Sequence, residues 1–270
     1  MIYLKNKHKT CTVKEFLKFK GVSKRTLTKL AKKLGIMKID DKPVIMTDTI
    51  LKNKSLCIDL KEPTPQTTVP LSNKPLKIIF EDEYILIVDK KSNLPTIPSH
   101  NFDDSLASQV VNYLGNDCVF RALNRLDAHT TGLVVIAKDV ITENLLVESG
   151  NIKKWYLAKV EGKTLQRGCI NAPIIDDETQ CKRVVDKNGL PAITYYKRLC
   201  YKNGISLVRC HLIYGRTNQI RCHFSYIGHP LVDDYKYNTN CQDPNAIFCL
   251  RCYELHFTHP YTNKSIKIKI

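Results

Sequence analysis

Two kinds of hydrophobic pattern divide the chain. Near the N-terminus, apolar side chains recur every three or four positions in TVKEFLKFKG and SKRTLTKLAKKLG, which predicts two short amphipathic helices. In the second helix Ser23 is the expected N-cap, Gly35 is the expected end, and Leu27, Leu30 and Leu34 form one apolar stripe. The segments IMKIDDKPVIM and ILKNKSLCIDL then have the pattern of short strands around polar turns.

From residue 76 onward the pattern is mainly that of strands. KIIF, YILIVDK, WYLAKVEG, AITYYKRL and GISLVRCHLIYG alternate or run apolar over strand lengths. Two helices are expected among them: DDSLASQVVNYLG, entered at Asp103 or Asp104 and ended by Gly115, and KDVITENLLVESG. Many strands with few helices predict the α+β class, with a long mixed, largely antiparallel sheet preceded by a small α/β-hairpin domain.

A proline-rich segment separates the two patterns. KEPTPQTTVPLSNKP holds four prolines in fifteen residues, which disfavours regular helices and ladders and indicates an extended linker. We therefore expect a small domain at residues 1–60, a linker at 61–75 and a large domain at 76–270.

The positive charge is concentrated in the small domain. Residues 1–60 carry 15 Lys or Arg and 5 Asp or Glu, so +10 of the net charge of +16 lies there. Such a surplus attracts polyanions, and nucleic acid is the expected partner; a merely solvated basic surface is the alternative. The second helix is expected to supply RNA contacts from its outer surface, through Lys24, Arg25, Lys29, Lys32 and Lys33. The two helices and hairpin of this unit resemble the S-four RNA-binding domain.

Several other features narrow the class of protein. The N-terminal MIYLKNKHKTCTV lacks the apolar segment of a secretory signal, and LVVIA is too short to cross a bilayer, so we expect a cytoplasmic protein without a membrane partner. Eleven cysteines without a regular framework favour free thiols over disulfides. Cys249, Cys252, His256 and His259 have a zinc-like spacing, but strand alternation separates Cys249 from the next two, so we expect no metal. No glycine-rich phosphate motif indicates a nucleotide cofactor, and no oligomer is required.

The stretch LNRLDAHTTGLVVIAKD carries the strongest candidate chemistry. Arg125 and Asp127 stand just before a Thr-Thr-Gly turn, and an apolar strand begins at Leu133. Because that strand must be buried and Gly132 permits a tight turn into it, Asp127 is expected on a loop anchored by the sheet. Such rigidly supported loops commonly carry catalytic residues.

This stretch resembles the His-Arg-Leu-Asp-x-x-Thr-Ser-Gly-Leu signature of the RluA family of pseudouridine synthases. The resemblance extends from residue 76 to the C-terminus: IIFEDEYILIVDKKSNLPTIPSH is similar to the opening strands and Lys-Pro-Ala-Gly loop, KKWYLAKVEG to the Lys-x-Tyr segment, and GCINAPI with GLPAITYY to the middle portion. IYGRTNQIRCHFSYIGHPLVDDYKYN is similar to the Gly-Arg-Thr-His-Gln-Ile-Arg-x-His block, and ELHFTHP to the closing strand.

The resemblance implies isomerisation of a uridine within RNA, ribosomal RNA first and transfer RNA second. Asp127 would stabilise or trap the electron-deficient sugar, or attack the base, and Arg221 would keep that carboxylate ionised. Arg125 would occupy the space left by the extruded nucleotide, and Tyr156 would stack on the uracil and serve as base or relay. Arg216 and Gln219 of the same family block are expected to contact RNA. No cofactor is implied.

Five positions depart from the family pattern. Asn124 and Asn218 replace histidines, so a hydrogen-bonding side chain is kept while proton transfer is lost. Asp233 and Asn238 replace glycines and are expected to keep a positive φ. The proline of the Lys-Pro-Ala-Gly loop is absent from KKSNLP.

Two other functions were weighed against the synthase. A catalytically inactive RNA-binding protein would not need the set Arg125, Asp127, Tyr156 and Arg221. A nucleoside hydrolase or glycosidase would need a second positioned carboxylate, and the sequence indicates no clear partner for Asp127.

Overall fold

The computed structural model describes residues 1–33, 35–59, 72–115, 118–150, 152–179 and 181–270. Leu34 and most of the expected linker, up to residue 71, lie outside these residues. No helix in the described part of the chain is long and apolar enough to cross a membrane.

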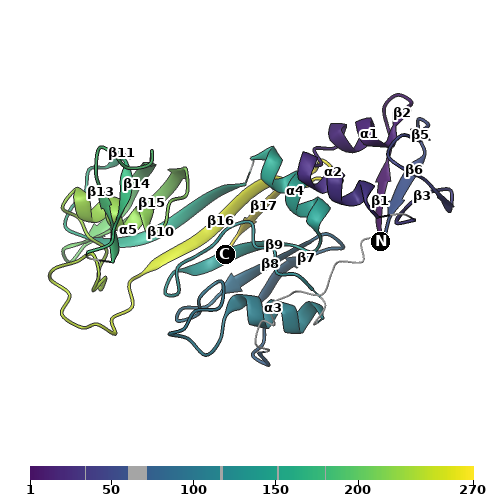
Figure 1. The fold of residues 1–270 in the computed structure, drawn as a ribbon. Helices are drawn as coiled ribbons and strands as arrows, with labels where there is room; N and C mark the ends of the chain where they lie inside the picture. The colour runs from purple at the N-terminus through teal and green to yellow at the C-terminus, as the bar shows by residue number, and fades with distance from the viewer. Residues whose placement is uncertain (34, 60–71, 116–117, 151, 180) are drawn as a thin grey trace.

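The first 58 residues form a small unit of two helices and short strands (Figure 1). A four-stranded sheet has the order β1-β6-β3-β4, and β2 pairs with β5. The elements are β1 (Ile2–Lys5), β2 (Cys11–Thr12), α1 (Val13–Phe19), α2 (Lys24–Ala31), β3 (Met37–Ile39), β4 (Lys42–Pro43), β5 (Thr49–Ile50) and β6 (Ser55–Ile58). Ser23 caps α2 by accepting a bond from Thr26 N–H, as predicted. The helix ends at Ala31 rather than near Gly35, and residues 31–33 are exposed.

The rest of the chain is built on one long sheet of order β11-β14-β15-β10-β16-β9-β8-β7, with β17 paired to β16. The pairing of β16 with β9 is parallel and the other pairings of this sheet are antiparallel, so the predicted mixed, largely antiparallel α+β fold is confirmed. Its strands are β7 (Ile78–Glu81), β8 (Ile85–Lys90), β9 (Thr131–Ala137), β10 (Lys153–Glu161), β11 (Arg167–Asn171), β14 (Ile193–Lys202), β15 (Ile205–Ile213), β16 (Leu250–Thr258) and β17 (Ser265–Lys269). A separate hairpin comprises β12 (Ile174–Asp177) and β13 (Lys182–Val185).

Three helices accompany the sheet: α3 (Leu106–Leu114), α4 (Val140–Ser149) and α5 (Gln219–Tyr226). The expected helix α4 begins after Asp139 and ends at Gly150. The N-cap of α3 is Ser105, whose hydroxyl accepts a bond from Ser108 N–H. Asp104 was a wrong choice of cap because its carboxylate is used by Ser72 and Gln109 instead.

Helix α5 was not expected from the sequence. Its six buried residues include Gln219, Arg221 and His223, so the segment shows little of the apolar stripe by which a surface helix is recognised.

The N-terminal unit packs against α4 (Figure 1). Ile141 of α4 is fully buried in the cluster formed by the core residues of that unit. Beside this apolar contact, the Asn144 amide donates to the Thr26 hydroxyl at 2.9 Å. The small unit therefore contacts the large sheet domain through the helix that directly follows β9.

Candidate active site

The loop of residues 124–130, which carries Asp127, is held by hydrogen bonds at three points. The Asn124 amide donates to the Leu133 carbonyl at 3.0 Å and accepts from Val135 N–H at 2.9 Å, which ties the start of the loop to β9. The Thr96 hydroxyl donates to the Leu126 carbonyl and accepts from Leu126 N–H. Asp127 thus stands on a backbone that is hydrogen-bonded on both sides of it, as the sequence predicted for an anchored loop.

Lys90 supplies the third point. Its ammonium is almost fully buried and donates to the carbonyls of Lys91, Leu94 and Ala128 at 2.6–3.0 Å. Burial lowers its pKa to about 8, while the nearby Asp127 carboxylate opposes that shift. Lys90 therefore brings a positive charge close to Asp127 as well as holding its loop.

Gly132 connects this loop to β9 at a point of very close contact. Its φ is +110°, and an added Cβ would lie 2.1 Å from the carbonyl oxygen of Cys252 on β16. Only glycine fits both the backbone conformation and the parallel pairing of β9 with β16 there. Gly132 lies within β9 rather than in a turn before it, and the neighbouring strand β16 is what requires a glycine there.

Arg221 reaches the site from the first turn of α5. Its Nε and Nη2 donate to the two carboxylate oxygens of Asp234, both at 2.7 Å, and its Nη1 donates to the Asn218 side-chain oxygen at 3.1 Å. The guanidinium also lies 4.3 Å from the ring centroid of Phe248 and 4.8 Å from that of Tyr237. The hydrogen bonds hold the edge of the guanidinium, and the two rings pack against its faces.

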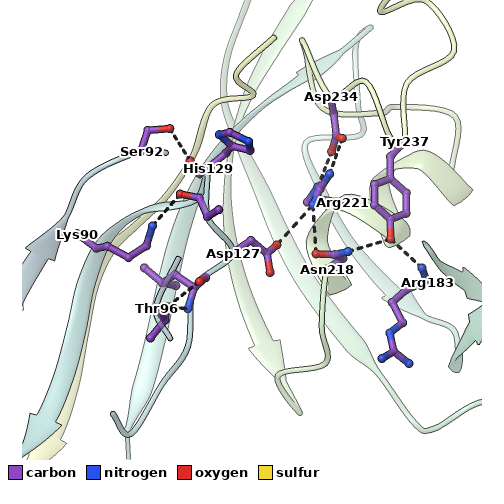
Figure 2. Close-up of polar contacts among 12 residues, drawn as sticks. Lys90, Ser92, Thr96, Asp127, His129, Arg183, Asn218, Arg221, Asp234 and Tyr237 are labelled. Atoms are coloured by element: carbon purple, nitrogen blue, oxygen red, sulfur yellow. Dashed lines mark hydrogen bonds and ion pairs between the residues drawn. The ribbon is translucent and has the colours of Figure 1, made fainter. Parts of the chain in front are cut away.

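Asp127 and Arg221 face one another across the site, as Figure 2 shows. The Arg221 Nη1 to Asp127 Oδ2 distance is 3.6 Å, longer than either bond to Asp234. Burial raises the pKa of Asp127, and the charges of Arg221 and Lys90 counteract this only in part. The expected pair is present, but the expectation that Arg221 alone holds the carboxylate fully ionised is too simple.

Tyr156 lies on β10 and forms part of the same site. It is paired with Cys210 of β15 and Cys252 of β16, and only 6% of it is exposed. Burial raises its pKa well above the usual value for tyrosine, so its hydroxyl stays protonated at neutral pH.

An open cavity of about 800 Å³ brings together five of the six site residues that the sequence predicted in the large domain. These five are Arg125, Asp127, Tyr156, Arg216 and Gln219; Arg221 contacts Asp127 but is not among the lining residues. Arg125 is exposed at the rim. The Gln219 side chain is already used within the protein, because its amide donates to the Ile193 carbonyl and accepts from Arg216 N–H.

The remaining predicted RNA contacts lie on α2 and in the two residues that follow it. Their side chains are exposed: Lys24, Arg25, Lys29, Lys32 and Lys33. Among the described residues, no group of three or more His, Cys, Asp or Glu side chains could hold a metal ion.

The departures from the family pattern are explained by local contacts. Asn218 begins α5 with φ +55°, and its side chain links Arg221 to the Tyr237 hydroxyl. Asp233 has φ +61°, as expected at a former glycine. Asn238 does not have a positive φ; it is buried instead and donates to Glu161 and to the Leu231 carbonyl.

Sequence reasoning missed two charged residues of this site. Asp234, which the sequence pattern does not single out, is fully buried and makes the shortest contacts to Arg221. Lys90, the last residue of β8, is not singled out by the sequence pattern either. A signal existed for each, since both are charged residues next to apolar runs in segments that matched the family.

The long sheet with a cavity on one face is the fold of a pseudouridine synthase. The structure of human RNA pseudouridylate synthase domain containing 1 superposes with a TM-score of 0.62 and 22% identity, covering 74% of this chain and 85% of that one. The family model for RNA pseudouridylate synthase matches residues 84–226.

The sequence relatives agree with this class. The uncharacterized RNA pseudouridine synthase YjbO of Bacillus subtilis is 30% identical over 265 residues, which is 95% of this chain and 93% of the relative. The ribosomal large subunit pseudouridine synthase D of Nitrosomonas europaea is 35% identical over 206 residues, 70% of this chain and 60% of the relative. The chain belongs to the RNA pseudouridylate synthase family and is an isomerase that converts uridine to pseudouridine in RNA.

Proposed function

We propose that this enzyme modifies uridines in structured ribosomal RNA, with Asp127 as the catalytic residue. The observation that carries the proposal is the cavity in which Asp127 stands on a fixed loop, opposite the guanidinium of Arg221. The relative named for the large ribosomal subunit supports ribosomal RNA, and a relative named as a tRNA pseudouridine synthase keeps transfer RNA as the second candidate.

The reaction breaks the bond between the ribose carbon and a ring nitrogen, turns the uracil, and joins the same ribose carbon to a ring carbon. Asp127 is the group placed to stabilise or trap the sugar while it lacks that bond, or to attack the base. The ring carbon that has formed the new bond then loses its proton, and the ring nitrogen that was released from the ribose takes one up, so that no atom is gained or lost overall. Arg221 and Lys90 favour the ionised carboxylate against the effect of burial.

Arg125 and Tyr156 have complementary proposed roles. Arg125 is exposed at the rim, where a planar guanidinium can occupy the stack that the target nucleotide has left. Tyr156 lines the cavity wall and can contact the turning uracil. Because the raised pKa of Tyr156 keeps its hydroxyl protonated, we propose a stacking or relay role for it rather than that of a base.

Arg216 and Gln219 are proposed to shape the RNA site from the start of α5. The Arg216 Nε donates to the Pro191 carbonyl at 3.1 Å, while its N–H is held by the Gln219 side chain. We infer that Arg216 supplies charge to the cavity and that Gln219 acts by positioning this turn.

The N-terminal residues 1–60 are proposed to be an S-four-like RNA-binding domain, joined through the linker at 61–75 to the catalytic domain. The exposed cations of α2 would contact phosphates, which gives affinity with a steep dependence on salt. We also propose that the enzyme works in the cytoplasm, in keeping with a cysteine set that suits a reducing compartment.

The experiment that tests the substrate is a pseudouridine map of ribosomal and transfer RNA from cells with and without the gene. We expect one or more ribosomal sites to disappear and to return when the gene is restored. Loss of sites in transfer RNA alone would replace the proposed substrate, and an unchanged map of both RNAs would reject it.

A further inference from the structure

The two ends of the long sheet are covered differently. At the β8 and β9 end nearly every residue is buried, with α3 and α4 lying on either side (Figure 1). At the other end β10, β14 and β15 alternate between buried and accessible residues. Here α5 packs on the cavity side, where His223 contacts Thr194 and Phe224 contacts Tyr196. The opposite side of β11, β14, β15 and β10 is therefore an open sheet face.

A row of ring side chains crosses this open face. The strand register places Tyr195, His211 and Trp155 directly beside one another on β14, β15 and β10. Trp155 stacks on His211 with ring centroids 5.1 Å apart and an interplanar angle of 25°. Tyr195 is 48% exposed, although it is an aromatic residue in the middle of a strand. On the other side of the sheet the neighbouring row contains Tyr156, so the ring row lies directly behind the active site.

The next row on the same face is cationic. Arg167, Lys197 and Arg209 are paired across β11, β14 and β15, and the row continues through Leu157 to Arg251. Arg167 and Lys197 are exposed and have no ion-pair partner among the residues that the structure describes. These side chains add no contact that the fold needs, yet they concentrate positive charge beside the rings.

The carboxylate within the ring row does not offset this charge. Glu254, paired with Trp155, is 4% exposed and already contacts Arg209, His256 and Lys267. The accessible surface of the face thus presents rings and cations together. Flat rings beside cations match a single-stranded nucleic acid, whose bases stack on aromatic side chains while its phosphates meet Lys and Arg.

We propose that the open face of β11, β14, β15 and β10 is a second RNA-binding surface, which takes a single-stranded segment of the RNA. Tyr195, His211 and Trp155 lie side by side and form the platform on which bases stack. Arg167 and Lys197 contact the phosphates. This surface would hold RNA outside the catalytic cavity and so raise affinity for long substrates without affecting the chemical step. The proposal rests on the enzyme acting on RNA and adds a surface to it.

The decisive variant combines Tyr195→Ala with Lys197→Glu in the full-length protein. The matched control is Tyr226→Ala with Lys187→Glu, which removes a tyrosine that is 62% exposed and reverses an exposed lysine, both outside the strands of this face. The probe is a fluorescently labelled 20-nucleotide oligouridylate. Its binding is followed by anisotropy at several salt concentrations, and in parallel by the emission of Trp155, the single tryptophan of the chain.

We expect the Tyr195→Ala, Lys197→Glu variant to bind the probe at least about tenfold more weakly, with a shallower salt dependence. The control variant should stay within about twofold of wild type. In the wild-type protein, oligouridylate should quench Trp155, and a short hairpin substrate that fills only the cavity should not reverse the quenching. If melting curves show that the double variant is unfolded, Lys197→Glu alone gives the same comparison.

Unchanged affinity in the folded variant, or binding without any response of Trp155, would overturn the proposal. An equal loss in the control variant would also overturn it. These outcomes are separate from failure of the proposed function. If the pseudouridine map is the same with and without the gene while oligouridylate still quenches Trp155, only the ribosomal substrate is rejected. If ribosomal sites disappear without the gene but the Tyr195→Ala, Lys197→Glu variant binds oligouridylate as wild type does, only this surface is rejected.

Discussion

Two carboxylates face Arg221, and the segments that carry them differ in almost every physical respect. Asp234 comes from the turn after Leu231, is fully buried, and bonds the guanidinium twice at 2.7 Å. Asp127 comes from the anchored loop before β9, keeps 31% of its side chain exposed, and lies 3.6 Å from the same guanidinium. One arginine therefore has a tight structural partner and a loose one that borders the cavity.

The difference shows how a single arginine serves both stability and chemistry. Asp234 offsets the charge of Arg221 and fixes its plane, so that less of that charge is available to Asp127. Burial raises the pKa of Asp127; the charges of Arg221 and Lys90 oppose that shift, and the charge of Asp234 adds to it. The Asp127 carboxylate is partly desolvated and borders the cavity, so it is available to react. The Asp234 carboxylate is fully buried and already bonded to Arg221.

The largest effect should come from Asp127→Asn. This change keeps the size of the side chain but removes the negative charge, so we expect kcat to fall by about 10⁴-fold or more, on the scale of a lost nucleophile. Affinity for RNA should change by less than about threefold. Single-turnover assays and filter binding on the same RNA measure both quantities.

Asp233→Asn is the matched control for that substitution. Asp233 is exposed next to Asp234 and has φ +61°, a conformation that asparagine tolerates. Normal turnover is expected for it. If Asp127→Asn turned over normally, Asp127 would take no part in catalysis, and the two carboxylates would not differ in function.

Asp234→Asn should have its largest effect on stability. It leaves the buried guanidinium of Arg221 without a charged partner, and breaking a buried pair in this way costs about 3–5 kcal/mol. We expect a clear decrease in the urea midpoint, together with a loss of turnover because Arg221 is no longer fixed. Equilibrium urea unfolding with Asp233→Asn alongside checks this; a midpoint equal to wild type would mean that Asp234 is not the structural partner.

The two segments were not equally predictable from the sequence. The Asp127 loop lies within a continuous motif, and its anchoring strand, glycine turn and neighbouring helix all follow from local pattern. The partnership of Asp234 with Arg221 depends on how α5 packs against a turn, and that packing leaves no local signature. Helix α5 itself buries polar side chains, so its periodicity does not reveal it.

The contacts that hold the Asp127 loop, and the ring row of the open sheet face, also join segments that are distant in the sequence. Lys90 acts on Ala128, which is 38 residues away in the chain, and the Thr96 contacts span 30 residues. Alternation identified the strands that contain Tyr195 and Trp155, but only the register aligns the two rings with His211. Local structure could thus be predicted from the sequence, whereas contacts between distant segments depend on tertiary packing and strand register.

A moderate effect is expected in the pH dependence of the reaction. Because burial raises the pKa of Asp127, kcat/KM should already fall at a pH where an ordinary aspartate is still ionised. The decrease should approach tenfold per pH unit on the acid side of that pKa. Lys90→Met removes a charge that favours the ionised carboxylate, so it should move the acid limb to higher pH. A rate that stays constant down to the usual aspartate pKa would show that the pKa of Asp127 is not raised.

The smallest effect, and the one with the most informative sign, is on the melting temperature of Asp127→Asn. A carboxyl whose pKa is raised on folding stabilises the folded state only while it is protonated, and that contribution is lost as pH rises through the raised pKa. At neutral pH the ionised Asp127 therefore costs stability, so Asp127→Asn should melt slightly above wild type, by a few degrees at most. The difference should shrink as pH falls toward the ordinary aspartate pKa, and Asp234→Asn should melt below wild type throughout. Differential scanning fluorimetry across a pH series measures both variants; a lower melting temperature for Asp127→Asn at neutral pH would mean that the 3.6 Å contact with Arg221 outweighs burial.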